Sequence, residues 1–359
     1  MSLTATLLAS NLSLYPIPHQ DKEWQVFSNV VASGYVEDNS VYQLVKGNKG
    51  KYDYGSEYAY TFNQAELGVG YQDISLAIFS RYEWYLDYSS DTLKVHAQTT
   101  NREDLDKNNN YNIYLEANHL ISEGIKLAYS PSITDNFHTH FAVSYLNAKE
   151  LMDGKLWGDF TQRSQKNYQG QLYLDYSFTE DELLGYDMRA PKSDYAYTTD
   201  FGFTWLFHEQ GLFSFYAQDV YSRISWVDAP YNRAEANSAR VDTDDNGFDS
   251  VRPAAKAILG YQDHIQTLPT KYHTRLAYIV DDQSISTKLF SVGDLYLVDV
   301  EWSRQWNQRV YTEISYTPQT QSWGAKLASH GIHLAVKADN TDYQQASVIN
   351  VAIGYTYQW

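Results

Sequence analysis

The residues of this 359-residue chain that could do chemistry are charged side chains that alternate with apolar ones along the sequence. Arg81 and Glu83, for example, alternate with Tyr82 and Trp84. Opposed rows of arginine and carboxylate side chains could set up a transverse field at a water-filled constriction, which would sort solutes by charge and dipole. They could instead pair into a network that packs a narrow interior. The candidates are Arg81, Glu83, Asp175, Asp200, Arg275, Asp299, Glu301, Arg309 and Glu313.

The segment from Asp242 to Asp249 carries the sharpest local motif. Oxygen-bearing side chains at alternate positions, with Gly247 at the bend, resemble the first half of an EF-hand-type calcium loop. Pro253 replaces the bidentate glutamate that the twelfth position requires, so a complete EF-hand is excluded. A degenerate calcium site in an external loop and an ordinary acidic turn both stay open. The candidate ligands are Asp242, Asp244, Asn246 and Asp249.

The histidines and paired carboxylates give no support for an enzyme. His138 and His140 would project to the same side of a strand and could form half a metal site, but no third ligand is identified. None of the ten histidines is followed two positions later by serine, the spacing that would let an imidazole activate a hydroxyl on the same strand. Carboxylate pairs such as Asp281 and Asp282 fall in loop-like sequence.

The element that best explains these positions is the last segment of the chain, from Ile349 to Trp359. Its side chains alternate strictly between apolar and polar. A strand with one fully apolar face needs an apolar medium against that face. The apolar face consists of Ile349, Val351, Ile353, Tyr355, Tyr357 and Trp359.

The same alternation recurs along the chain. It predicts further strands at residues 74–88, 168–178, 194–207, 272–280 and 310–316. These runs have about the length that a tilted strand needs to cross a bilayer. A charge facing lipid at mid-depth costs about 2–4 kcal/mol, so the charged residues opposite the apolar faces should point into a lumen.

Connections between the predicted strands alternate between short and long. Tight turns are predicted at residues 72–73, 123–124, 209–211 and 307–308, on the periplasmic side. Long polar loops are predicted at residues 36–56, 89–110 and 227–253, on the outside. With both termini in the periplasm the strand number is even, and the segmentation indicates about 14 to 16 strands. Such a barrel should be too wide for side chains alone to fill, which favours a channel.

Composition limits the class of protein. The mean hydropathy is -0.51, yet 16% of the residues are aromatic, an excess that the two interfacial girdles of a membrane barrel would use. The chain has no cysteine, which excludes disulfides and thiolate metal sites. The net charge of -17 argues against a nucleic-acid partner, which would require a basic patch.

The repeated pattern and its aromatic end resemble the outer-membrane β-barrels of Gram-negative bacteria, of the porin and solute-specific channel class. In that class a strand ending like Tyr355, Tyr357 and Trp359 is the assembly signal. The resemblance implies an all-β fold, a transmembrane antiparallel up-and-down barrel over residues 24–359, after a lead-in or signal remnant at 1–23. It also implies a precursor with a signal peptide, and lipid, lipopolysaccharide and the barrel-assembly machinery as partners.

The implied function is passive diffusion of small hydrophilic solutes, with saccharides or cations as candidates, by a monomer or trimer without a cofactor. Two alternatives stay open from the sequence. One is a barrel enzyme that acts on lipid or peptide, and the other is a structural or adhesive barrel without an open pore.

Overall fold

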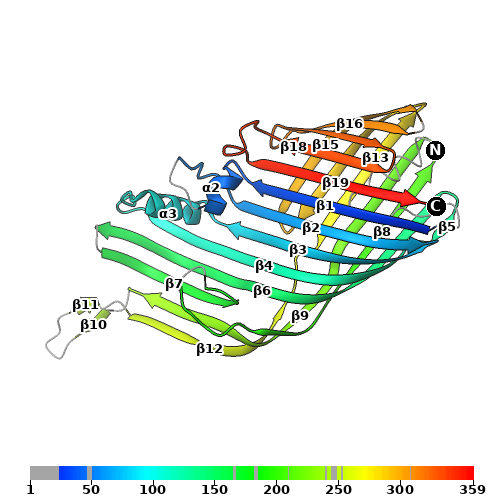
Figure 1. Cartoon of the computed structure of the whole chain (residues 1–359). Helices are drawn as coiled ribbons and strands as arrows, with labels where there is room; N and C mark the ends of the chain where they lie inside the picture. Colours follow the sequence, from blue (N-terminus) through cyan, green and yellow to red (C-terminus); the bar gives the residue numbers. More distant parts are fainter. Residues whose placement is uncertain are drawn as a thin grey trace.

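Fourteen antiparallel strands close on themselves into a barrel (Figure 1). The computed structural model describes residues 24–46, 51–164, 167–181, 185–208, 210–238, 241–243, 249–251, 254–307 and 309–359. The strands of the ring are, in order, β1 (Trp24–Val36), β2 (Tyr58–Tyr71), β3 (Ile74–Tyr88), β4 (Asn110–Tyr129), β6 (Phe137–Ser164), β8 (Lys192–Phe207), β9 (Gly211–Asn237), β13 (Lys271–Val280), β14 (Gln283–Val292), β15 (Leu295–Asn307), β16 (Val310–Thr317), β17 (Ser322–Ser329), β18 (Ile332–Ala338) and β19 (Val348–Gln358). The predicted barrel is confirmed, at the lower end of the predicted strand number.

The first and last strands close the ring. β1 pairs with β19 from Gln25 and Gln358 to Tyr35 and Val348. The backbone N–H of Trp24 donates to the carbonyl of Trp359, and the reverse bond has the same length of 3.1 Å. We call the end of the barrel that holds these two residues the terminal end, and the opposite end the loop end. The segment 1–23 lies outside the described residues.

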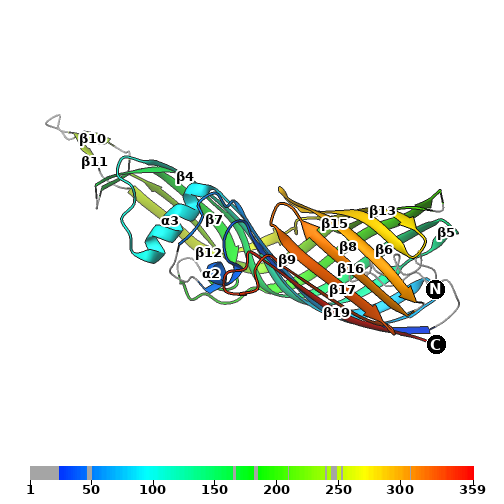
Figure 2. The ribbon, with the colours of Figure 1, turned by 90° about the horizontal axis from the view of Figure 1, so that it is seen from above.

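Three strands continue beyond the barrel at the loop end and, with two further strands, form a sheet that we call the extension (Figures 1 and 2). It consists of the distal parts of β4, β6 and β9 with β7 (Asn167–Phe178) and β12 (Ala254–Gln266). β6 pairs with β8 in the barrel and with β7 in the extension. Likewise, β9 pairs with β13 in the barrel and with β12 in the extension. Along this side the wall is therefore much longer than on the side of β16 to β18.

Two predicted connections are wrong. Residues 123–124 form no turn, because β4 runs unbroken through them. Gly124 serves packing instead, since a Cβ there would collide with the ring of Phe79. The predicted loop at 227–253 is strand as far as Asn237. Beyond it, β10 (Val241–Thr243) and β11 (Asp249–Val251) pair as a short hairpin, and β5 (Ser132–Thr134) is a small addition beside β6.

Two helices lie at the loop end. α2 (Val41–Lys46) lies between β1 and β2, and α3 (Ser90–Asn101) lies between β3 and β4. Ser89 caps α3, because its hydroxyl accepts the N–H of Thr92 at 3.2 Å. Val95 of α3 packs against Tyr111 and Phe160 on the inner face of the extension. Neither helix, among the residues that the structure describes, is long and apolar enough to cross a membrane.

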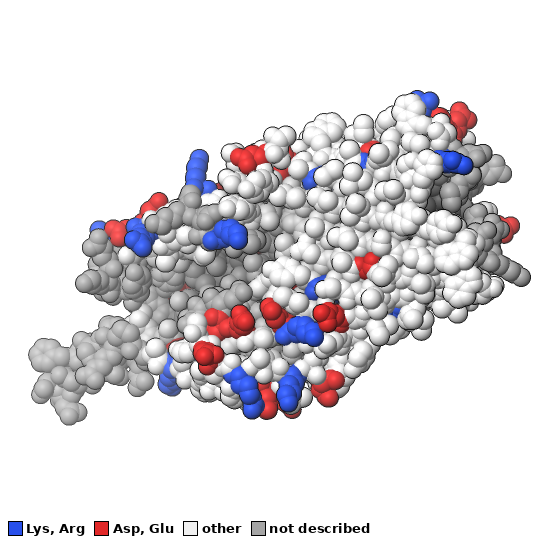
Figure 3. All heavy atoms as spheres, in the orientation of Figure 1, with Lys and Arg blue, Asp and Glu red and all other residues white. Residues whose placement is uncertain are grey.

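The outer surface of the barrel is an apolar belt, seen as the largely uncharged region of Figure 3. On β3, Ile74, Leu76 and Ile78 are 50–59% exposed, whereas Ser75 and Ala77 between them are buried. Aromatic side chains gather at the terminal end, among them Trp24, Tyr71, Tyr129, Tyr357 and Trp359. So large an apolar surface is unfavourable in water and requires an apolar environment.

The outer face of the extension is charged instead. Glu116, Lys155, Asp175 and Arg233 stand side by side on β4, β6, β7 and β9 in direct cross-strand register. Lys155 lies 2.8 Å from Glu116, and Arg233 lies 2.9 Å from Asp175. The same strands therefore change from an apolar to a charged outer face along their length, which indicates that the extension stands in water.

Candidate functional site: the barrel lumen

Most of the charged residues singled out from the sequence face the interior of the barrel. Those that do are Arg81, Glu83, Asp200, Arg275, Asp299, Glu301 and Glu313. Two lie elsewhere. Asp175 belongs to the charged outer face of the extension, above the closed barrel. Arg309 lies in the turn between β15 and β16 at the terminal end, where its exposed side chain contacts His330.

Charged side chains join β3 to β9 and β13 across the interior. Arg81 Nη1 donates to both carboxylate oxygens of Asp219, at 3.0 and 3.1 Å. Lys271 Nζ lies 2.7 Å from Asp219 and 2.8 Å from Glu83. Each of these four side chains is at most 5% exposed. Because β3 is neither paired with β9 nor with β13, these contacts bridge the lumen.

A second group of ion pairs lies on the wall formed by β13 to β16. Arg275 Nη2 lies 3.0 Å from Glu301 and 3.2 Å from Glu313. Lys288 Nζ lies 2.5 Å from Glu301 and 3.4 Å from Glu313. Glu301 and Glu313 are 2% and 6% exposed, whereas Lys288 is 30% exposed. The carboxylates therefore lie behind the lysine that faces the lumen.

Apolar packing closes the part of the lumen between β3 and β9. Phe79, Leu120, Leu146 and Trp226 belong to one buried cluster there, with Trp226 completely buried. Nearer the loop end, Tyr85 of β3 reaches the turn between β14 and β15, where its hydroxyl accepts the N–H of Asp294 at 3.4 Å. The strand number led us to expect a lumen too wide for side chains to fill, and for this half of the barrel that prediction is wrong.

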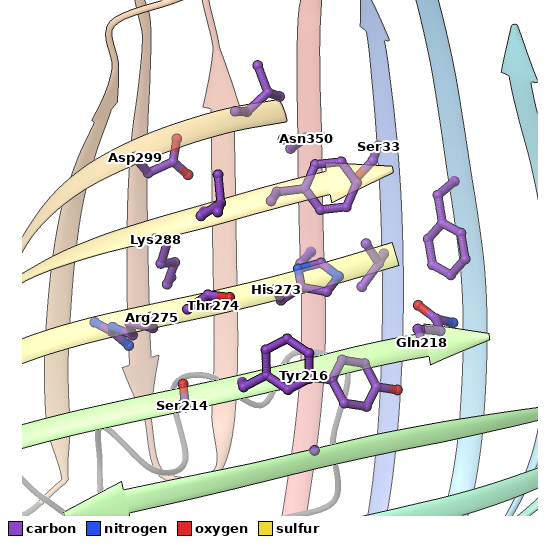
Figure 4. A pocket seen from close by; sticks show the side chains of 18 of the residues that line it. Ser33, Ser214, Tyr216, Gln218, His273, Thr274, Arg275, Lys288, Asp299 and Asn350 are labelled. Atoms are coloured by element: carbon purple, nitrogen blue, oxygen red, sulfur yellow. The ribbon is translucent and has the colours of Figure 1, made fainter. Parts of the chain in front are cut away.

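The other half holds a cavity of about 340 Å³ (Figure 4). Its lining runs from Tyr35 and Leu297, near the loop end, to His138 and Thr204, near the terminal end. His273, Tyr216, Gln218 and Lys288 point into it from β13, β9 and β14 (Figure 4). The cavity therefore extends along much of the length of the barrel.

A wider, open depression of about 1000 Å³, which we call the vestibule, lies above this cavity at the loop end. Loop residues after β1, β14, β16 and β18 line it, and it shares Tyr35 and Leu297 with the lumen cavity. Lys51 is the basic residue among its described lining residues. The acidic ones are Glu37, Asp38, Asp53, Asp294 and Asp339.

Burial raises the pKa of the Glu37 carboxyl in this vestibule. The hydrogen bond that this carboxyl accepts from the backbone N–H of Glu57 lowers the pKa, but by less. Asp38 and Asp294 are both exposed. The vestibule thus combines an open volume with a local excess of negative charge.

Two serine–histidine contacts that the sequence spacing had not revealed lie at the terminal end of the cavity. Ser130 Oγ is 2.8 Å from His140 Nδ1, and Ser132 Oγ is 2.8 Å from His138 Nδ1. In hydrolytic triads the serine bonds Nε2 and a carboxylate orients Nδ1. Here serine occupies Nδ1, so the arrangement differs from a catalytic one.

The described residues include only some of the metal candidates from the sequence. No group of three or more histidine and carboxylate residues suited to a metal is found among the described residues. Asp242 and Asp249 lie on β10 and β11, and Thr243 pairs with Asp249 in the backbone register. Asp244 and Asn246 lie outside the described residues, so the calcium hypothesis stays a prediction.

Sequence reasoning missed several lumen residues. Lys326 and Lys337 directly adjoin the outward-facing Leu327 and Val336, so the same parity argument would have found them. Asp219 offered no such signal. Its φ of 56° lies in the left-handed region, and the pairing of β8 with β9 shifts register beside it, so alternation fails there.

No protein-family model and no curated protein matches the chain. Among solved structures, a TodX mutant described as a monoaromatic hydrocarbon channel is 10% identical, with a TM-score of 0.43, over 99% of this chain and 92% of that one. The P. putida toluene transporter TodX is 10% identical, with a TM-score of 0.34, over 98% and 92%. A Pseudomonas aeruginosa FadL homologue is 10% identical, with a TM-score of 0.26, over 94% and 88%.

These likenesses are remote and name no particular family. The resemblance in fold class to barrel channels rests on the closed antiparallel barrel itself.

Proposed function

We propose that this protein is a channel of the bacterial outer membrane through which small polar solutes diffuse without energy input. The observation that supports it best is the vestibule, which meets the lumen cavity at Tyr35 and Leu297 inside a barrel with an apolar exterior. The proposed orientation puts the terminal end in the periplasm and the charged extension outside the cell. Lipid and lipopolysaccharide would then contact the apolar belt, and the barrel-assembly machinery would insert the chain.

The proposed channel is narrow. The ion pairs of Arg81 and Lys271 and the packed cluster around Trp226 fill one half of the lumen, so solutes would pass only through the other half. Five carboxylates around the vestibule would concentrate cations at the mouth, within a screening length of about 10 Å at 0.1 M salt. Small conductance and a preference for cations are the expected properties.

The test is planar-bilayer recording of the refolded protein. Stable single-channel current steps are expected. Because the chain has no cysteine, Leu297→Cys would create a unique thiol where the vestibule meets the cavity. A bulky charged methanethiosulfonate reagent should then reduce the current, while the same treatment of Lys155→Cys, on the outer face of the extension, should not.

A barrel without an open pore is the competing function, because buried ion pairs bridge β3 to β9 and β13. Correctly folded protein that carries no current at any voltage would favour that function and overturn the channel. Current that is equally insensitive to modification at both cysteines would show that ions take another path.

A further inference from the structure

Aromatic rings form a continuous track along the lumen cavity. The ring of Tyr60 lies 5.6 Å from that of Phe290, which lies 5.0 Å from the imidazole of His273. His273 in turn lies 6.0 Å from Tyr216, whose ring lies 5.9 Å from that of His140. These residues come from β2, β14, β13, β9 and β6, so the track crosses from one wall to another. Figure 4 labels two of them, Tyr216 and His273. Rings at such spacings contact one another, and because all five line the cavity, they offer it an apolar surface against which a flat ligand can pack.

Beside the track, the cavity presents cations rather than carboxylates. Arg275, Lys288, Lys326 and Lys337 all line it, whereas Asp299 is the one carboxylate among its described lining residues. Lys337 lies 2.6 Å from Asp299, with side-chain exposures of 13% and 22%. Glu301 and Glu313, which pair with Arg275 and Lys288, do not line the cavity.

With those two glutamates included, the four cations that line the cavity stand against three carboxylates, all on β15 and β16. Among these described residues one positive charge is in excess, on the side that a ligand would touch. An anionic group would be attracted there.

The vestibule has the opposite character. Its described lining residues include five carboxylates and one basic residue, Lys51. Five tyrosines also line it, namely Tyr35, Tyr52, Tyr54, Tyr58 and Tyr296. Carboxylates and the faces of tyrosine rings both attract an ammonium group. Tyr35 belongs to the vestibule and to the cavity, so the negative region and the positive region adjoin.

We propose that the lumen cavity binds zwitterionic aromatic amino acids, with the ring on the aromatic track, the carboxylate toward Lys288, Lys326 and Lys337, and the ammonium group toward the vestibule. This inference rests on the proposed channel function and names its solute class. The cavity volume falls within the range of about 300–1,000 Å³ that small-molecule sites occupy.

Each simpler solute uses only part of this arrangement. An aromatic carboxylate without an ammonium group must pass the acidic vestibule against repulsion. An aromatic amine is attracted to the vestibule but meets the excess positive charge of the cavity. A neutral saccharide can stack on the rings but gains nothing from either charged region.

The experiment measures binding to the refolded full chain in detergent micelles by saturation-transfer NMR and calorimetry. Phenylalanine, benzoate, 2-phenylethylamine and maltose are compared at low salt. Phenylalanine should bind at least about fivefold more tightly than each of the others, because only it engages both charged regions. Equal or tighter binding of benzoate, of the amine or of maltose would overturn the assignment.

Variants locate the site. Lys337→Gln and Phe290→Leu should each weaken phenylalanine binding, the first by about tenfold, as expected for losing one hydrogen bond to a charged group. Lys155→Gln is the matched control, because it removes one lysine and one ion pair outside the lumen, and it should leave binding unchanged. Equal effects of Lys337→Gln and Lys155→Gln would overturn the site.

Conductance separates this inference from the proposed function. Current steps that phenylalanine interrupts would support both. Current steps without any phenylalanine preference in binding would overturn the inference alone. Phenylalanine binding without current would overturn the channel while leaving the binding site in place.

Discussion

Neutralising Arg81 should destabilise the protein far more than neutralising a lysine on the outer face of the extension. In Arg81→Met, Asp219 and Glu83 remain buried, and Lys271 is the one cation in the described part of the chain that pairs with them, so one carboxylate charge is left without compensation. Breaking a buried ion pair by removing one partner costs about 3–5 kcal/mol. Lys155 is half-exposed beside Glu116, so Lys155→Met should lower the free energy of unfolding by less than about 1 kcal/mol.

The second step of this prediction is a double-mutant cycle. Asp219→Asn alone leaves Arg81 and Lys271 facing Glu83, an excess of one positive charge. Asparagine suits the left-handed backbone at this position, where φ is 56°. Together the two changes leave Lys271 and Glu83 as a balanced pair. The double variant should therefore recover about 1–3 kcal/mol relative to the sum of the single variants.

The assay is reversible urea unfolding of the protein in phospholipid vesicles, followed by the fluorescence of its nine tryptophans. Midpoints and slopes give the free energy of unfolding for each variant. Two results would refute the view that these side chains form one charge-balanced bridge. One is that Arg81→Met is no less stable than Lys155→Met, and the other is that the two single changes add strictly in the double variant.

The remaining predictions concern assembly, calcium, a turn and selectivity. Replacing Trp359 with serine should impair outer-membrane insertion at native expression far more than a loop change, and normal insertion would contradict the assembly role. Calcium, if bound, should raise the melting temperature at millimolar concentration through the acidic loop, and Asp242→Ala should abolish the shift. Gly331→Ala should lower stability by about 1–3 kcal/mol, because its φ of 82° is strained for alanine and a Cβ would meet a carbonyl of β19; unchanged urea midpoints would disprove this. Replacing Asp38 and Asp294 together by asparagine should reduce cation preference in reversal potentials, and an unchanged potential would exclude the vestibule as the selective region.

The sequence by itself determined the strands and their two faces. Alternation placed β3 at Ile74–Tyr88, as observed, and put Arg81 opposite Tyr82. It also fixed the apolar face of the last segment, Ile349 to Trp359, where Tyr355, Tyr357 and Trp359 are 42–55% exposed. This information is local, because neighbouring side chains on a strand point to opposite sides whatever the rest of the fold does.

Tertiary structure alone decided what the interior residues contact. Arg81 meets Asp219, which lies 138 positions away, because ring closure and strand register bring β3 against β9. No periodicity encodes such a pairing, since it depends on the number of strands and their stagger. For the same reason, the expected turn at Gly124 was continuous strand, and Asp175 lay outside the lumen once β7 proved to belong to the extension. Parity tells which side of the wall a residue occupies, and only the closed barrel determines what faces it there.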